Sequence, residues 1–180
     1  MKIYMTDEIR EMIKNGELPE VTHENYYSPE INKKYMSFHT WLSFHGSPGL
    51  VGCEARAIAE LNGEYVDEDK DDTALMVGSY VDSALAGEDG ELEIFKKEHE
   101  EVFTKKGELK SQYKMAEKMI ERCKKDKLFM AYLSGEKQTI FLAVLYGVPV
   151  KCKLDSHIAG KCIDDLKIQR FNLSADRQAN

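Results

Sequence analysis

Residues 136–168, EKQTIFLAVLYGVPVKCKLDSHIAGKCIDDLKI, decide the fold. Their β-branched and aromatic bias is typical of strands, and Gly147 with Pro149 marks a turn inside the run. We expect two antiparallel strands over residues 139–155, a turn over residues 156–161, and a third strand over residues 162–168. The stretch therefore predicts a small antiparallel β-meander.

The second predicted strand alternates polar residues with residues suited to a core, because residues two apart share a face. Its polar face carries Lys151, Lys153 and Asp155, and its core face carries Val150, Cys152 and Leu154. On the third strand Asp165 and Lys167 share one face. If these strands pair, two carboxylates and one ammonium group meet at the polar face of the sheet.

Such a group of side chains suits phosphodiester cleavage, which needs a nucleophilic water and stabilisation of charge on the phosphoryl oxygens. Carboxylates that hold Mg²⁺ supply both. Lys167 is then expected to position the water or help to deprotonate it. A D-x-K triplet alone is more often a surface ion pair, so the catalytic interpretation depends on its context.

The preceding residues predict a mainly helical part. Amphipathic patterns and capping residues indicate helices over residues 6–15, 53–61, 72–86, 110–124 and 128–133. Tyr35, Phe38, Trp41 and Phe44 recur every three residues, and we favour core packing over base stacking for this stripe. The expected class is α+β: one domain over residues 1–180, with a helical part (1–135) packed on the β-sheet part with the metal site (136–168), and a tail (169–180).

Composition narrows the class of protein further. The chain has 180 residues and a net charge of −7, which argues against a protein that coats nucleic acid, although part of the negative charge can belong to a metal site. No apolar run is long enough to cross a membrane, so we expect a cytoplasmic protein. The four cysteines form no C-x-x-C pair and indicate reduced, mostly buried thiols; a zinc site from Cys53 with His39 or His45 is a weaker alternative.

Several ordered stretches carry a family resemblance over residues 25–168. They are YYSPEINKKYMS, GCEARAIAELNGEY, LMVGSYVDSAL, KKGELKSQYKMAEKMIER, LFMAYLSGEKQ and GVPVKCKLDSHIAGKCIDDLK. Together they resemble the phage-encoded PDDEXK-like exonuclease family related to RecE and lambda exonuclease. The resemblance implies a Mg²⁺- or Mn²⁺-dependent exonuclease acting on linear duplex DNA in a bacterial host cell, with Asp155, Asp165 and Lys167 at the catalytic centre.

The resemblance also implies roles for residues outside that centre. The family's G-x-x-x-H motif places a metal-binding His where this chain has Asp82, four residues after Gly78; an exposed helix residue is the alternative. Glu136 matches an acidic residue that supports the metal. Arg56 resembles an arginine near a terminal phosphate, with a surface ion pair as an equal alternative. Lys151 and Lys153 are expected to contact the substrate.

Two features depart from the family pattern. Asp164 occupies a position that should face the apolar side of the third strand, so it must find a partner, lie exposed or bind metal. We find no counterpart of the helix and strand that usually follow the third core strand. This predicts a fragment or a shortened relative, with an exposed sheet edge open to self-association.

If the chain is a shortened relative, we expect one of two roles other than cleavage. In the first, the chain is a phage inhibitor that binds a host nuclease such as a CRISPR effector, using its acidic charge to compete for a basic channel. In the second, a structural metal such as zinc stabilises the fold.

Overall fold

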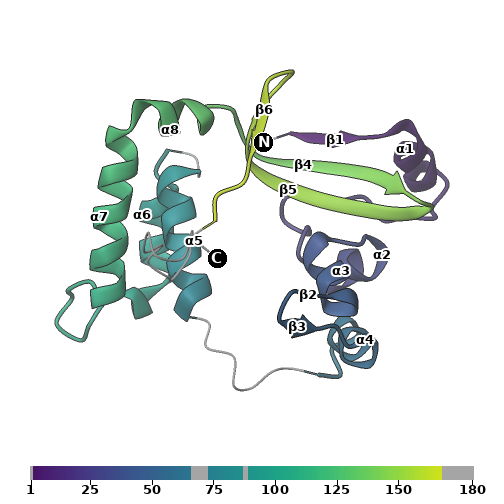
Figure 1. Ribbon diagram of the computed structural model, residues 1–180, viewed down its shortest axis with the longest axis horizontal. Coiled ribbons are helices and arrows are strands. Elements are labelled where there is room, and N and C mark those ends of the chain that lie inside the picture. The colour runs from purple at the N-terminus through teal and green to yellow at the C-terminus, as the bar shows by residue number, and fades with distance from the viewer. Residues whose placement is uncertain (1, 66–72, 87–88, 168–180) are drawn as a thin grey trace. The chain divides into compact units, whose positions relative to one another are not determined.

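The computed structural model describes residues 2–65, 73–86 and 89–167 (Figure 1). Helices and a mixed sheet make up the chain, which confirms the α+β class. Contacts divide the chain into two compact units. Unit 1 comprises Met1–Lys70 with Gln138–Leu154, and unit 2 comprises Asp71–Lys137 with Asp155–Asn180. The prediction of a single domain stays a prediction.

The principal sheet has the strand order β1-β4-β5-β6. Its strands are β1 (Ile3–Met5), β4 (Glu136–Leu145), β5 (Val148–Ile158) and β6 (Cys162–Asp164). β1 pairs in parallel with β4, whereas β5 and β6 are antiparallel. The three predicted strands lie side by side in chain order as β4, β5 and β6, and the parallel strand β1 is an addition that the sequence analysis did not predict.

The two turns of this sheet differ in how well the sequence located them. Between β4 and β5, Tyr146 has φ 53° and Gly147 has φ 79°, the positive values that a two-residue type I′ hairpin turn requires. The second predicted turn begins too early. Ser156 lies within β5, fully buried, and pairs in register with Asp164.

Unit 1 packs helices around a core that contains Ile9, Val21, Ile31, Tyr35 and Ile140. The helices and small hairpin of this unit are α1 (Asp7–Lys14), α2 (Pro29–Lys34), α3 (Phe38–His45), β2 (Gly46–Ser47), β3 (Leu50–Val51) and α4 (Glu54–Asn62). Thr6 caps the first helix, accepting a bond from the backbone N–H of Ile9 at 3.5 Å. Gly63, at φ 74°, ends α4.

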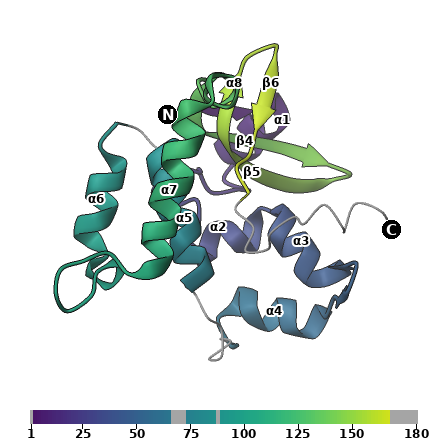
Figure 2. The same cartoon turned by 60° about the vertical axis from the view of Figure 1, so that its left-hand side comes forward.

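Unit 2 is built on α5, which packs against both α6 and α7 (Figures 1 and 2). Its helices are α5 (Thr73–Leu85), α6 (Glu91–Glu98), a 3₁₀ turn (Glu100–Val102), α7 (Ser111–Lys125) and α8 (Lys127–Tyr132). Tyr80, Val81 and Tyr113 are among the buried residues at this contact. The Tyr80 hydroxyl donates to Glu117, and Lys96 approaches the same carboxylate at 3.1 Å, so α5, α6 and α7 also share one polar contact.

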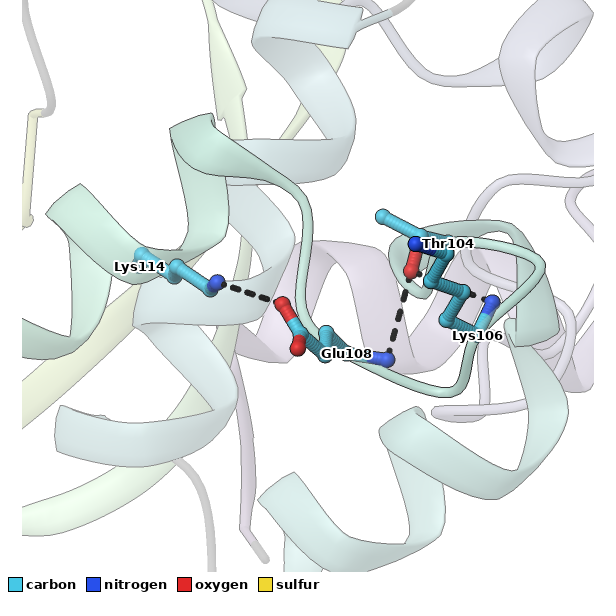
Figure 3. Close-up of polar contacts among 4 residues, drawn as sticks. All are labelled: Thr104, Lys106, Glu108 and Lys114. Carbon is cyan, nitrogen blue, oxygen red and sulfur yellow. Dashed lines mark hydrogen bonds and ion pairs between the residues drawn. The ribbon is translucent and has the colours of Figure 1, made fainter.

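The loop that leads into α7 is tied by its own polar groups (Figure 3). The Thr104 hydroxyl accepts bonds from the backbone N–H groups of Lys106 at 3.4 Å and Glu108 at 3.3 Å. The Glu108 carboxylate in turn pairs with Lys114 on α7 at 3.1 Å. These bonds fix the direction in which the chain enters the helix.

Strand β5 corrects the predicted assignment of faces. Lys151 is buried, whereas Cys152 is exposed. The Lys151 ammonium donates to the Tyr26 carbonyl and to Asn32 Oδ1 at 2.6 Å, and it lies 4.3 Å from the centre of the Tyr26 ring. These partners compensate the buried charge, and burial lowers the pKa of Lys151 to about 8.

Two predictions about burial are wrong in part. The four thiols are free, but Cys53 and Cys152 are exposed and the other two are only partly buried. In the aromatic stripe Tyr35 is fully buried, whereas Phe38 and Trp41 are exposed. Within the described residues, no helix has the length and apolar character needed to span a bilayer.

Candidate active site

A hydrogen bond joins Asp155 on β5 to the segment that follows β6. Asp155 Oδ2 accepts from the backbone N–H of Leu166 at 2.6 Å. In the antiparallel register Ser156 pairs with Asp164, so the residues after Asp164 lie next to Asp155. Asp155 therefore lies beside the D-x-K triplet that ends in Lys167. Because β6 stops at Asp164, the triplet is an extension of the strand rather than part of it.

The triplet contains its own ion pair, between Asp165 and Lys167. The hydrogen bond that the Lys167 ammonium donates to Asp165 raises the pKa of Lys167, and the charges of Asp155 and Asp82 act in the same direction. Lys167 is therefore a stable cation at neutral pH. Its side chain is 74% exposed, so the ammonium can reach a bound molecule.

Asp82 on α5 faces the same charges. Its Oδ1 atom is buried and has no hydrogen-bond partner among the residues that the structure describes. Burial raises the pKa of Asp82 to about 7, and repulsion from Asp155 and Asp165 adds to the shift, while Lys167 opposes it. We call Asp82, Asp155, Asp165 and Lys167 the acidic cluster.

Lys137, which the sequence did not single out, lies close to this cluster. Its partly buried ammonium donates to the carbonyl oxygens of Leu85 at 3.2 Å and Leu133. Burial lowers the pKa of Lys137, and the charge of Asp155 opposes that shift. The sequence gives no signal that Lys137 lies near the cluster, because only the fold brings this lysine close to Asp155.

Two other acidic residues lie beside different partners. Glu136 Oε2 is 3.8 Å from His157 Nδ1 on the neighbouring strand. Asp164 Oδ2 is buried and lacks a hydrogen-bond partner within the described part of the chain, although the Cys162 thiol bonds to this carboxylate. Desolvation and the Asp164 carboxylate raise the pKa of that thiol. The metal-supporting role of Glu136 stays a prediction.

The three basic residues predicted to contact substrate all belong to unit 1, whereas the acidic cluster belongs to unit 2. Arg56 pairs with Glu60 at 2.7 Å and lies 5.2 Å from the centre of the Tyr65 ring. Lys153 lies 5.5 Å from the centre of the Tyr27 ring. Like the buried Lys151, both contact residues of unit 1, and the roles of all three toward substrate stay predictions.

The acidic cluster offers oxygen ligands of the kind that Mg²⁺ and Mn²⁺ prefer. Asp82 interacts electrostatically with Asp155 and Asp165, and one of its oxygens is buried without a partner among the described residues. Three such carboxylates fit a hard divalent cation. No set of three or more His, Cys, Asp and Glu residues within the described ranges already has the close spacing of a metal site. The chemistry of the donors fits a cation, while their present arrangement includes the Asp165–Lys167 pair.

Strand β5 carries Asp155, and the segment that follows β6 brings the Asp165-x-Lys167 triplet beside it, an arrangement that suits a nuclease. Residues 37–177 match the family model described as a PDDEXK-like domain of unknown function (DUF3799). The chain belongs to this PDDEXK-like family. Nucleases of this fold generally use divalent metals.

A solved structure supports the same assignment. The chain is 48% identical to a protein from Eubacterium rectale described as "Putative exonuclease", with a TM-score of 0.74. The match covers 82% of this chain and 54% of that one, so this chain spans about half the length of the Eubacterium protein. Among curated proteins there is no match.

Proposed function

We propose that this chain hydrolyses phosphodiester bonds in linear duplex DNA, as an exonuclease, with Mg²⁺ or Mn²⁺ bound at the acidic cluster. The observation that carries the proposal is Asp82, whose buried, unpartnered oxygen shares one electrostatic group with Asp155 and Asp165. A buried carboxylate without a partner is costly in a structural role. Membership of the PDDEXK-like family and the Eubacterium relative support the same activity.

The residues of the cluster divide the work between them. Asp82, Asp155 and Asp165 would hold the cation, which supplies a water of lowered pKa and stabilises charge on the phosphoryl oxygens. The Leu166 N–H holds one oxygen of Asp155 and so limits its rotation. Since the pKa of Lys167 is raised, its ammonium keeps its proton and serves to orient water and offset developing negative charge, and does not act as a base.

The test is cleavage of a 5′-phosphorylated linear duplex in Mg²⁺, in Mn²⁺ and in chelator. We expect degradation with either cation and none in chelator. Lys167→Ala should reduce the rate by roughly 100-fold or more, without loss of fold, because the side chain is 74% exposed. Lys118→Ala, which removes an exposed lysine from α7, is the matched control. Cleavage in chelator, or full activity of Lys167→Ala, would contradict the proposal.

The acidic balance of the chain favours a second candidate. A net charge of −7 suits a phage protein that does not cleave DNA and instead occupies the basic channel of a host nuclease, such as a CRISPR effector. This candidate predicts no degradation of duplex in any cation, together with a stoichiometric complex with the purified effector. Robust cleavage without such a complex excludes it.

A further inference from the structure

Three aromatic rings form a stack on one face of α3. The rings of Phe38 and Trp41 lie at 13° to one another with centres 6.2 Å apart, and those of Trp41 and His45 lie at 13° with centres 4.5 Å apart. Their spacing of three and four residues places them on a single helix face. We call Phe38, Trp41 and His45 the aromatic stack.

Local hydrogen bonds hold the stack in place. The Ser37 hydroxyl accepts from the Thr40 N–H at 3.1 Å and so caps the helix beside Phe38. His45 Nδ1 donates to the Trp41 carbonyl at 3.1 Å, since a carbonyl oxygen can only accept, and this bond fixes the imidazole against the indole. These bonds support the helix beside Phe38 and the contact of His45 with Trp41 without a ligand.

The stack is also open to solvent. Phe38, the terminal ring, is 72% exposed and Trp41 is 43% exposed. No residue of α3 is fully buried, so the helix does not use these rings to build a core. Parallel rings with an open terminal face can extend the stack with a further flat ring, which is the geometry that nucleobases present.

The stretch of sequence that contains the stack differs in charge from the chain as a whole. Asp and Glu make up 32 of the 180 residues, yet none occurs from residue 31 to residue 53. The same run contains Lys33 and Lys34, both exposed, and two histidines. Because these lysines precede Phe38 by at most five residues, they lie within about 18 Å of it. An acid-free, basic and aromatic run in an acidic protein fits a ligand that carries both flat rings and negative charge.

We propose that the aromatic stack binds the unpaired bases of a single DNA strand, and that Lys33 and Lys34 contact its phosphates. Base stacking on aromatic rings tolerates any sequence, as an exonuclease requires. The inference rests on the proposed function only in taking DNA as the ligand. It concerns a surface of unit 1 that is built from different residues than the acidic cluster.

The only tryptophan of the chain belongs to the stack, so intrinsic fluorescence reports on it directly. Titration in chelator prevents cleavage. We expect an oligothymidylate to quench Trp41, and an abasic oligonucleotide of equal length to leave it unquenched. Equal quenching by the abasic strand would mean that the site binds phosphate charge and not bases, which overturns the inference. Absence of quenching by either strand would also overturn it.

Variants test the two contributions separately, with binding measured by anisotropy of a labelled oligothymidylate. Phe38→Ala should weaken Kd by roughly 5- to 150-fold, the range for loss of one stacked base. Replacing both Lys33 and Lys34 by Ala should reduce the slope of log K against log salt by about 1.4. Met115→Ala, which truncates a side chain 67% exposed on α7, is the control and should bind as the wild type does.

The outcomes separate this inference from the proposed function. Wild-type affinity of a Phe38→Ala protein with an unchanged circular dichroism spectrum would overturn the aromatic stack as a base-binding site, even if duplex cleavage is intact. Conversely, Lys167→Ala should lose cleavage and still quench with oligothymidylate. Quenching that persists when the wild type fails to cleave would contradict the proposed function alone.

Discussion

Replacing Asp82 by Asn should make the metal-free protein more stable at alkaline pH. Burial and neighbouring carboxylates raise the pKa of Asp82 from 3.8 to about 7. The folded protein therefore binds this proton more tightly than the unfolded chain does. The stability that Asp82 contributes is complete below pH 3.8 and is lost as pH rises to about 7. Asn keeps the shape of the side chain and removes the ionisation.

The size of the effect follows from the shift in pKa. A shift of about three pH units corresponds to at most ~4 kcal/mol. Asp82 is only partly buried and water screens its charge, so we reduce this figure by about half or more. We expect the advantage of Asp82→Asn over the wild type to grow by about 1–2 kcal/mol between pH 4.5 and pH 8. That difference corresponds to a shift of about 0.5–1 M in the urea midpoint.

Urea unfolding followed by circular dichroism, in chelator at both pH values, measures this difference. Glu98→Gln, which removes the same formal charge from an exposed position on α6, should show no comparable pH dependence. Added Mg²⁺ at pH 8 should stabilise the wild type more than Asp82→Asn, because a cation that binds only the folded state shifts the equilibrium. If the variant is no more stable than the wild type at pH 8, the buried carboxylate is not a source of strain and the reasoning fails.

Two further predictions concern packing that supports the sheet. Ser156 is fully buried, donates to the Tyr132 carbonyl at 2.8 Å and accepts from the Gly135 N–H at 3.0 Å, so Ser156→Ala should lower the free energy of unfolding by about 1–3 kcal/mol. Urea unfolding measures this loss, and an equal loss in the exposed control Ser134→Ala would argue against it. Because burial lowers the pKa of Lys151 to about 8, the wild type should gain roughly 1–2 kcal/mol as pH rises from 7 to 10. Lys151→Met should remove this gain, so its melting temperature should change less with pH than that of the wild type. If the two proteins show the same change in melting temperature with pH, the prediction is wrong.

Local sequence signals located α1, α4, α5, α7 and α8 and missed α2 and α6. The located helices have recognisable local chemistry. Thr6 begins α1 and Gly63 ends α4 through bonds to nearby backbone groups, and residues of these types are common at helix ends. Strand β1 was not predicted, because three residues are too few to show the alternation of polar and apolar side chains that indicates a strand. Its pairing with β4 joins positions more than a hundred residues apart, as between Ile3 and Ile140, and no local pattern encodes such a contact.

Burial was harder to predict than secondary structure. Strand alternation placed Cys152 inside and Lys151 outside, and the fold reverses both because Tyr26 and Asn32 supply acceptors for a buried ammonium. The same limit applies to the aromatic stripe, where helical spacing correctly grouped Phe38 with Trp41 but could not say which way they face. Periodicity gives the residues that share a face, whereas the partner of that face depends on distant parts of the chain.

The sequence could predict that Asp155 lies near the D-x-K triplet, because a short turn joins the two antiparallel segments that carry them. The position of Asp82 depends on how α5 packs, so only the resemblance to a family suggested it. An Asp where the family carries a His changes the charge of the cluster. Three carboxylates and one ammonium carry a formal charge of −2 when all are ionised, whereas a neutral His would leave −1. The Asp therefore increases the attraction for a divalent cation and also the repulsion when none is bound. Burial is the largest cause of the raised pKa of Asp82, and this repulsion adds to it. Cation binding, proton release from Asp82 and stability of unit 2 should consequently change together with pH.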